Sequence, residues 1–156
     1  MIAQEQIDRL CDKVHGKRHP SLEPMATADN KDGGYVLLYD LGGGLCKIER
    51  TRKPGPAVDR MFRTSVQPVA RFYLSRPSDR FCAVKAMVAR TLKSNLVATD
   101  VYRFSFDKLV TAVRDAVGSG LTAADIEARA LAREEHFAEV LESIKDGSFF
   151  TGGGVA

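Results

Sequence analysis

The feature that most constrains the fold is a run of three glycines between two stretches of strand-forming residues. Residues 35–41 read Tyr-Val-Leu-Leu-Tyr-Asp-Leu, and residues 45–52 alternate apolar with charged side chains after Leu45. Glycine adopts positive φ without a steric cost, so residues 42–44 can form a tight turn. A phosphate-binding loop would instead lead into a helix with a Gly-Lys-Ser/Thr motif, and here a strand follows. The sequence therefore predicts a β-hairpin over residues 35–52.

Helical periodicity flanks this hairpin on both sides. Residues 2–17 and 78–93 carry apolar side chains at helical spacing, and Ser78 and Ser105 are suited to capping helices. Thr122 and Asp125 approach a capping box at the start of the last helix, whose apolar stripe is Phe137, Val140, Leu141 and Ile144. Residues 53–56 are expected to end the second strand of the hairpin. The remaining expectations are a loop over 18–34, an extended stretch over 61–74, a further strand over 96–104, and helices over 105–117 and 122–145.

This order of elements predicts an α+β fold. We expect an N-terminal helix, a mainly antiparallel sheet of three to four strands, helices packed on one face of it, and a helical C-terminus. A chain of 156 residues is expected to form one domain, here residues 1–148. The glycine-rich end, residues 149–156, is predicted to be a flexible tail.

Cysteine use and hydropathy bear on the location of the chain. Its three cysteines are far apart in sequence and odd in number, which argues against a secreted disulfide scaffold. The N-terminus lacks a basic region followed by an apolar one, and no apolar run is long enough to span a bilayer. We therefore expect a cytoplasmic protein with no membrane association.

Charge is distributed unevenly along the chain. Between Lys47 and Lys93 there are twelve basic residues and three acidic ones, a net charge of +9, while the segments before and after carry −2 and −4. Clustered Lys and Arg favour contact with phosphate backbones, and neighbouring aromatic residues can stack on unpaired bases. The first functional hypothesis is therefore a non-catalytic nucleic-acid-binding or accessory protein. Its candidate binding residues are Arg50, Arg52, Lys53, Arg60, Arg63, Arg71, Arg76 and Arg80.

Two alternatives remain open for the same segment. The cations could bind an acidic surface of a partner protein, which would make the chain an interaction or regulatory module. They could also be solvated surface charges, partly balanced by the acidic last helix. That helix is rich in alanine in its first half, so it could pack within the chain or across a homodimer. DNA, RNA and an acidic protein all satisfy the charge pattern.

The third hypothesis is an enzyme without a recognisable motif. Cys11, His15 and His19 would share one face if the first helix continued through residue 19, and these side chains can bind zinc. Gly16 and Pro20 oppose such a helix, so we interpret Cys11 as a buried residue and the histidines as loop residues. Cys82 lies near a helix start among basic neighbours, where a thiolate is stabilised, but Phe81 and Val84 favour a core position. No metal, cofactor or catalytic residue is assigned.

Overall fold

The computed structural model describes residues 2–17, 20–26 and 33–147 of the chain. The predicted flexible tail and His19 lie outside these residues. The described part of the chain begins with a helix and ends with two consecutive helices. The elements are α1 (Gln4–Leu10), β1 (Lys13–Gly16), α2 (Glu23–Ala26), β2 (Tyr35–Gly42), β3 (Leu45–Thr51), α3 (Pro54–Thr64), β4 (Arg71–Leu74), α4 (Phe81–Thr91), a short 3-10 helix (Lys93–Asn95), β5 (Leu96–Ala98), β6 (Val101–Arg103), α5 (Phe106–Val117) and α6 (Ala123–Asp146).

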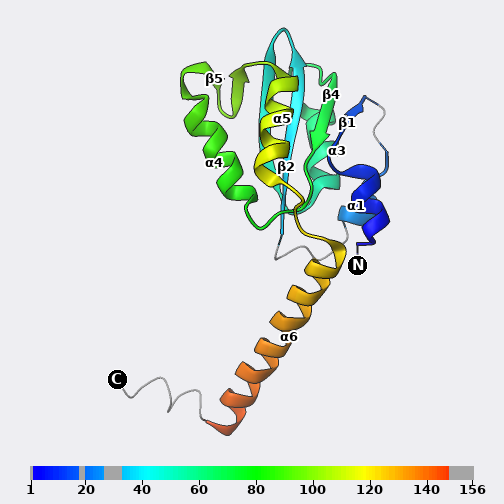
Figure 1. Ribbon diagram of the computed structural model, residues 1–156, viewed down its shortest axis with the longest axis vertical. Helices are drawn as coiled ribbons and strands as arrows, with labels where there is room; N and C mark the ends of the chain where they lie inside the picture. The colour runs from blue at the N-terminus through cyan, green and yellow to red at the C-terminus, as the bar shows by residue number, and fades with distance from the viewer. Residues whose placement is uncertain (1, 18–19, 27–32, 148–156) are drawn as a thin grey trace.

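The strands form one antiparallel sheet in the order β1-β4-β2-β3-β6-β5, with the predicted β2–β3 hairpin at its centre (Figure 1). Glycines 42, 43 and 44 all have positive φ, as the turn requires. The α+β class is confirmed. The sheet has six strands rather than three or four. Edge strand β1 lies in a segment predicted to be helical, and residues 96–104, predicted as one strand, contain both β5 and β6.

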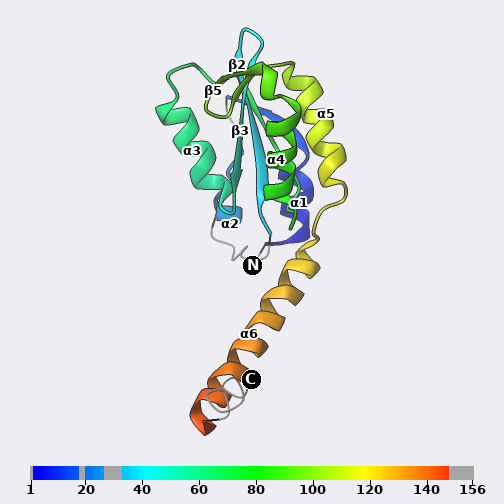
Figure 2. The ribbon, with the colours of Figure 1, turned by 90° about the vertical axis from the view of Figure 1, so that its left-hand side faces the viewer.

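Helices cover both faces of the sheet, which corrects the expectation of a single covered face. Tyr35, Leu37 and Tyr39 of β2 pack with residues of α1, α2 and α3 in one apolar core. Val36 and Leu38 of the same strand pack with α4 and α5 in a second core. Figure 2 shows α3 on one side of the sheet and α4 with α5 on the other. All five residues are fully buried because β2 is covered on both sides.

The predicted first helix, residues 2–17, is wrong beyond Leu10. The chain turns at Asp12, which has a φ of +65°, and then forms edge strand β1 against β4. Asp12 is held there by a backbone hydrogen bond from its N–H to the carbonyl of Leu74 and by side-chain bonds from Tyr73 and Arg114. These partners are 61 to 102 residues away, so local periodicity carries no sign of them.

The extended stretch predicted for residues 61–74 is a strand only over Arg71–Leu74. Strand β3 ends at Thr51, as the prediction that residues 53–56 end this strand requires, and Pro54 then begins α3. Proline is tolerated in the first turn of a helix, where its missing N–H has no helical partner. Ala57, Val58 and Met61 then form the buried face of α3, so the segment is a helix lying on the sheet.

The two C-terminal helices begin as predicted. The hydroxyl of Ser105 accepts a hydrogen bond from the N–H of Lys108, and Thr122 and Asp125 form a reciprocal capping box. Ser78, by contrast, does not cap α4, which is preceded by Arg80. Helix α6 packs on the domain only at its start and then extends away from it (Figures 1 and 2).

Candidate functional site

Three of the predicted nucleic-acid-binding arginines form ion pairs within the domain. Arg60 pairs with Glu49, and Arg71 Nε lies 2.8 Å from Asp40 Oδ2. Arg76 Nη1 lies 3.0 Å from Asp8 Oδ1, and this hydrogen bond holds the pKa of Asp8 below its ordinary value. Three of the eight predicted binding residues are therefore paired with carboxylates of the same chain.

Three other predicted arginines meet at the start of α4. Arg50 donates to the sulfur of Cys82, and the Arg52 guanidinium lies 5.5 Å from the centre of the Phe81 ring. Arg80 immediately precedes the helix and is exposed. Because the Phe81 ring is buried, it offers no free face to a nucleic-acid base.

Lys53 and Arg63, the remaining predicted residues, belong to the opposite helical layer. Lys53 precedes the first residue of α3, and Arg63 lies in its last turn. Both are exposed. The eight predicted cations are thus divided between ion pairs, the start of α4 and the two ends of α3, rather than gathered on one surface.

The structure separates Cys11 and His15 into different elements. Cys11 follows α1 and is buried, and burial raises the pKa of its thiol to about 12. His15 lies on β1 with Nε2 2.7 Å from the carbonyl oxygen of Leu10. Within residues 2–17, 20–26 and 33–147, no three His, Cys, Asp or Glu side chains are placed to bind a metal ion. The third member of the pattern, His19, is not among these residues.

The core position favoured for Cys82 is wrong. Its side chain is exposed in the first turn of α4 beside Arg50. Phe81 and Val84 take the buried positions of that turn, and Cys82 falls on the outer side of the helix.

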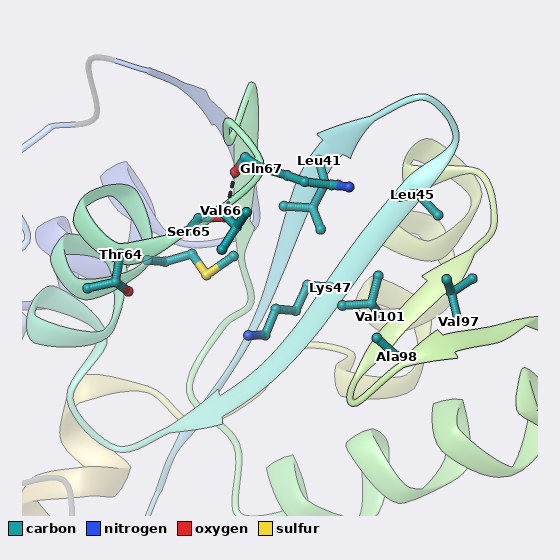
Figure 3. Close-up of a pocket in the computed structure, with 11 residues that line it drawn as sticks. Leu41, Leu45, Lys47, Thr64, Ser65, Val66, Gln67, Val97, Ala98 and Val101 are labelled. Carbon is teal, nitrogen blue, oxygen red and sulfur yellow. Dashed lines mark hydrogen bonds between the residues drawn. The ribbon is translucent and has the colours of Figure 1, made fainter.

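A hollow lies on the sheet face that carries α3 (Figure 3). It is an open groove of about 470 Å³ between the C-terminal end of α3 and the β5–β6 edge. We call it the sheet groove. Most of the side chains that line it are apolar or uncharged. The lining residues are Leu41, Leu45, Lys47, Met61, Thr64, Ser65, Val66, Gln67, Val97, Ala98 and Val101.

The floor of the sheet groove follows from strand register. Lys47 is paired with Val101, and Leu45 with Arg103, so these four side chains point to the face of the sheet that carries α3. On that face α3 packs over β2 and β4. The strands β3, β6 and β5 therefore present apolar side chains beyond the edge of the helix.

Two walls of the sheet groove carry strongly exposed valines. Val66, in the loop after α3, is 100% exposed, and Val97 on β5 is 53% exposed. Exposed apolar side chains that gather in one patch, unlike a single exposed valine, are typical of an interaction site. Figure 3 shows Val66 on one wall and Val97 on the other, with Lys47 between them.

Among the residues that the structure describes, Lys47 is the one cation that lines the sheet groove. The nearest carboxylate on its strand face, that of Glu49, is occupied by Arg60 and by the Tyr39 hydroxyl. Lys47 has no ion pair with any residue that the structure describes. The site thus combines exposed apolar side chains with one available ammonium group.

Sequence reasoning did not single out the sheet groove. The alternation of Leu45 and Lys47 places them on one strand face, but only the position of α3 shows that this face is left open. Val66, between polar Ser65 and Gln67, was a local sign of an exposed apolar residue.

No protein-family model matches the chain, and comparisons with curated proteins and with solved structures give no significant match. In the described residues, none of the helices is both long and apolar enough to cross a lipid bilayer.

Proposed function

We propose that this chain is a protein-interaction module that binds an apolar segment of a protein in the sheet groove. The observation that carries the proposal is the juxtaposition of exposed Val66 and Val97 with Lys47 on a sheet face beyond α3. Burial of apolar surface supplies the affinity, at about 25 cal/mol per Å² removed from water. Lys47 supplies selectivity, because it favours a segment with a carboxylate next to its apolar side chains.

The partner chemistry follows from the size and charge of the site. A groove of about 470 Å³ accommodates a few large side chains rather than a whole domain surface. The bound segment is expected to be short and amphipathic, with two or three aliphatic or aromatic residues and an Asp or Glu. Such a segment agrees with the alternative that the chain binds an acidic partner protein. The proposal assigns that contact to the sheet groove instead of to the whole basic segment.

A display selection tests this proposal. The full chain is immobilised and used to select from random peptides, and the affinity of selected peptides is measured by fluorescence anisotropy. Val97→Glu is expected to weaken binding at least about tenfold, because it places a charge in the apolar site. Val14→Glu is the matched control, since Val14 is also an exposed strand valine but lies on β1 at the other edge of the sheet.

Charge reversal at Lys47 tests the selectivity. Lys47→Glu should reverse the preference of the groove from acidic to basic peptides. Unchanged binding by both Val97→Glu and Lys47→Glu would remove the sheet groove as the binding site.

A second candidate function, contact with nucleic acid, is favoured by the convergence of Arg50, Arg52 and Arg80 at the start of α4. Such contact would be salt-dependent, with the slope of log K against log salt changing by about 0.9 for each phosphate contact on duplex DNA. The triple variant R50A/R52A/R80A should flatten this slope, and Arg90→Ala, an exposed cation further along α4, should change it less. Absence of binding at low salt would eliminate this candidate.

A further inference from the structure

Helix α6 carries an apolar stripe that its own domain does not cover. Its first two turns are anchored: Ile126 is buried in the core, the N–H of Ala123 donates to Gln4, and Arg129 pairs with Asp79. Beyond them Phe137, Leu141 and Ile144 are 62%, 41% and 42% exposed. At 100° per residue, positions 126, 137, 140 and 144 lie on one side of the helix. The side that is buried at the base of α6 therefore continues, uncovered, along its length.

An isolated helix with this stripe needs a partner surface. Most of the stability of a protein helix comes from packing its apolar face rather than from intrinsic helix propensity. Figures 1 and 2 show α6 leaving the domain, and no other helix or strand of the described residues lies beside its distal half. The capping box at Thr122 and the left-handed Gly147 fix its two ends, so the helix is well defined although its stripe is exposed.

The sheet groove and α6 are complementary in chemistry. Residues 123–146 contain seven acidic and three basic residues, a net charge of −4. At 100° per residue, Glu134 flanks Phe137 and Leu141 on the helix surface, whereas Glu139 and Glu142 lie on the opposite side. The groove offers Lys47, with exposed Arg103 on the same sheet face. A helix presenting Phe137, Leu141 and Ile144 beside the Glu134 carboxylate fits the segment that the sheet groove is proposed to bind.

The two features also lie at opposite ends of the molecule. The groove is built from the β2–β3 hairpin end of the sheet, the loop after α3 and the β5–β6 hairpin, whereas α6 leaves from the other end (Figure 1). With 24 residues, α6 is about 36 Å long. If a second copy lay inverted beside the first, its groove would be near the distal half of the first copy's α6. By symmetry, the second copy's α6 would then lie near the groove of the first copy.

Building on the proposed function, we infer that the occupant of the sheet groove is α6 of a second copy of this chain. The two copies exchange α6 helices around a two-fold axis. The exchange covers both the apolar stripe of α6 and the sheet groove. Because of the two-fold symmetry the contact is made twice, so the dimer buries twice the area of one contact. Stable interfaces typically bury roughly 1,200–2,000 Å² in total.

Light scattering after size exclusion tests the inference on the full chain. The wild type is expected at twice its mass of 17.1 kDa. A helix variant, F137E/L141E, and a groove variant, V66E/V97E, should each raise the dimer dissociation constant more than about 100-fold, because every exchanged contact gains like or unpaired charges. Leu131→Glu, on another side of α6, and Val14→Glu, on the opposite sheet edge, should remain dimeric. Circular dichroism checks that all four variants are folded.

A mixing experiment identifies the mode of association. In an equimolar mixture, the helix variant supplies an intact groove and the groove variant supplies an intact α6. One of the two exchanged contacts can therefore form. The mixed dimer should have an affinity between that of the wild type and that of either variant alone. If the groove variant is a dimer by itself, α6 pairs with α6 and the exchange is overturned.

The inference and the proposed function can fail separately. A monomeric wild type that still binds selected peptides in the sheet groove would overturn the exchange and leave the proposed function intact. A monomeric wild type whose groove binds no peptide would overturn both. A dimer that both V66E/V97E and F137E/L141E disrupt, and that mixing restores, supports both.

Discussion

Arg114 and Asp12, which are 102 residues apart, are joined by a hydrogen bond of 2.8 Å from Arg114 Nε to Asp12 Oδ1. The hydroxyl of Tyr73 donates to the same carboxylate oxygen at 2.7 Å, and the Arg114 guanidinium lies 5.5 Å from the centre of the Tyr73 ring. This junction ties the turn between α1 and β1 to β4 and α5. It explains why the N-terminal segment becomes an edge strand instead of continuing as a helix.

Removal of the Asp12 carboxylate should destabilise the domain. In Asp12→Ala the Tyr73 hydroxyl and Arg114 Nε lose their carboxylate acceptor, although Arg114 Nη2 keeps the backbone carbonyl of residue 12. Alanine is also strained at a φ of +65°. We expect a loss of about 2–3 kcal/mol in the free energy of unfolding, measured in urea. Asp12→Asn should cost less, because asparagine tolerates positive φ and keeps one acceptor. Equal stability of Asp12→Ala and the wild type would contradict the role given to this junction.

Gly34 allows the chain to pass closely over α4. A Cβ added at this position would lie 2.5 Å from the ring of Phe81, and the Gly34 backbone exchanges hydrogen bonds with Ser78 on the other side. Gly34→Ala is therefore expected to destabilise the domain by about 1–3 kcal/mol through overpacking. Gly16→Ala, where nothing lies within 4 Å, is the control, and its melting temperature should stay close to that of the wild type. A similar change in both would count against the close contact.

The three cysteines should react at very different rates in the folded protein. Cys82 is exposed, whereas Cys11 and Cys46 are buried, and burial raises the pKa of their thiols to about 12 and about 11. Thiolate is the reactive form, so at pH 8 iodoacetamide should label Cys82 first. Mass spectrometry of peptides after brief labelling measures this order. Early labelling of Cys46 would mean that the sheet opens around β3 and β6.

The raised thiol pKa values also predict a loss of stability in alkali. An unfolded thiol ionises near pH 9, while folded Cys11 and Cys46 remain protonated until about pH 12 and pH 11. Their contribution is therefore fully present below pH 9 and is lost progressively above it, as the unfolded state releases protons first. The urea midpoint should fall between pH 9 and 10, before unfolded tyrosines ionise. In C11A/C46A the fall should be shallower, and an identical pH profile would refute this linkage.

Parts of the fold governed by neighbouring residues could be predicted from the sequence. The Gly42–Gly44 turn, the Ser105 cap and the Thr122–Asp125 capping box all act within a few residues, and each forms as expected. The covering of both sheet faces also had a sign in the sequence. The uninterrupted run from Tyr35 to Tyr39 is typical of a strand buried on both sides, although an alternating strand follows it.

Features set by distant contacts could not be predicted. The turn at Asp12 depends on Tyr73 and Arg114, and the helical state of residues 54–64 depends on the sheet surface that Val58 and Met61 cover. The same is true of function. The charge pattern indicated Arg60, Arg71 and Arg76 as binding residues, but in the folded chain these side chains form ion pairs. The sheet groove exists because α3 leaves part of a sheet face open, and this cannot be seen in the sequence.

The central claim is that the sheet groove holds a protein segment, and that this segment is α6 of a second copy. Photo-crosslinking measures it most directly, with a photoreactive phenylalanine analogue placed at Val97 in an equimolar mixture of unlabelled and ¹⁵N-labelled chains. The account predicts crosslinked peptides of mixed isotope composition that join Val97 to residues 137–144. Crosslinks confined to single chains, or mixed crosslinks that avoid α6, would contradict it.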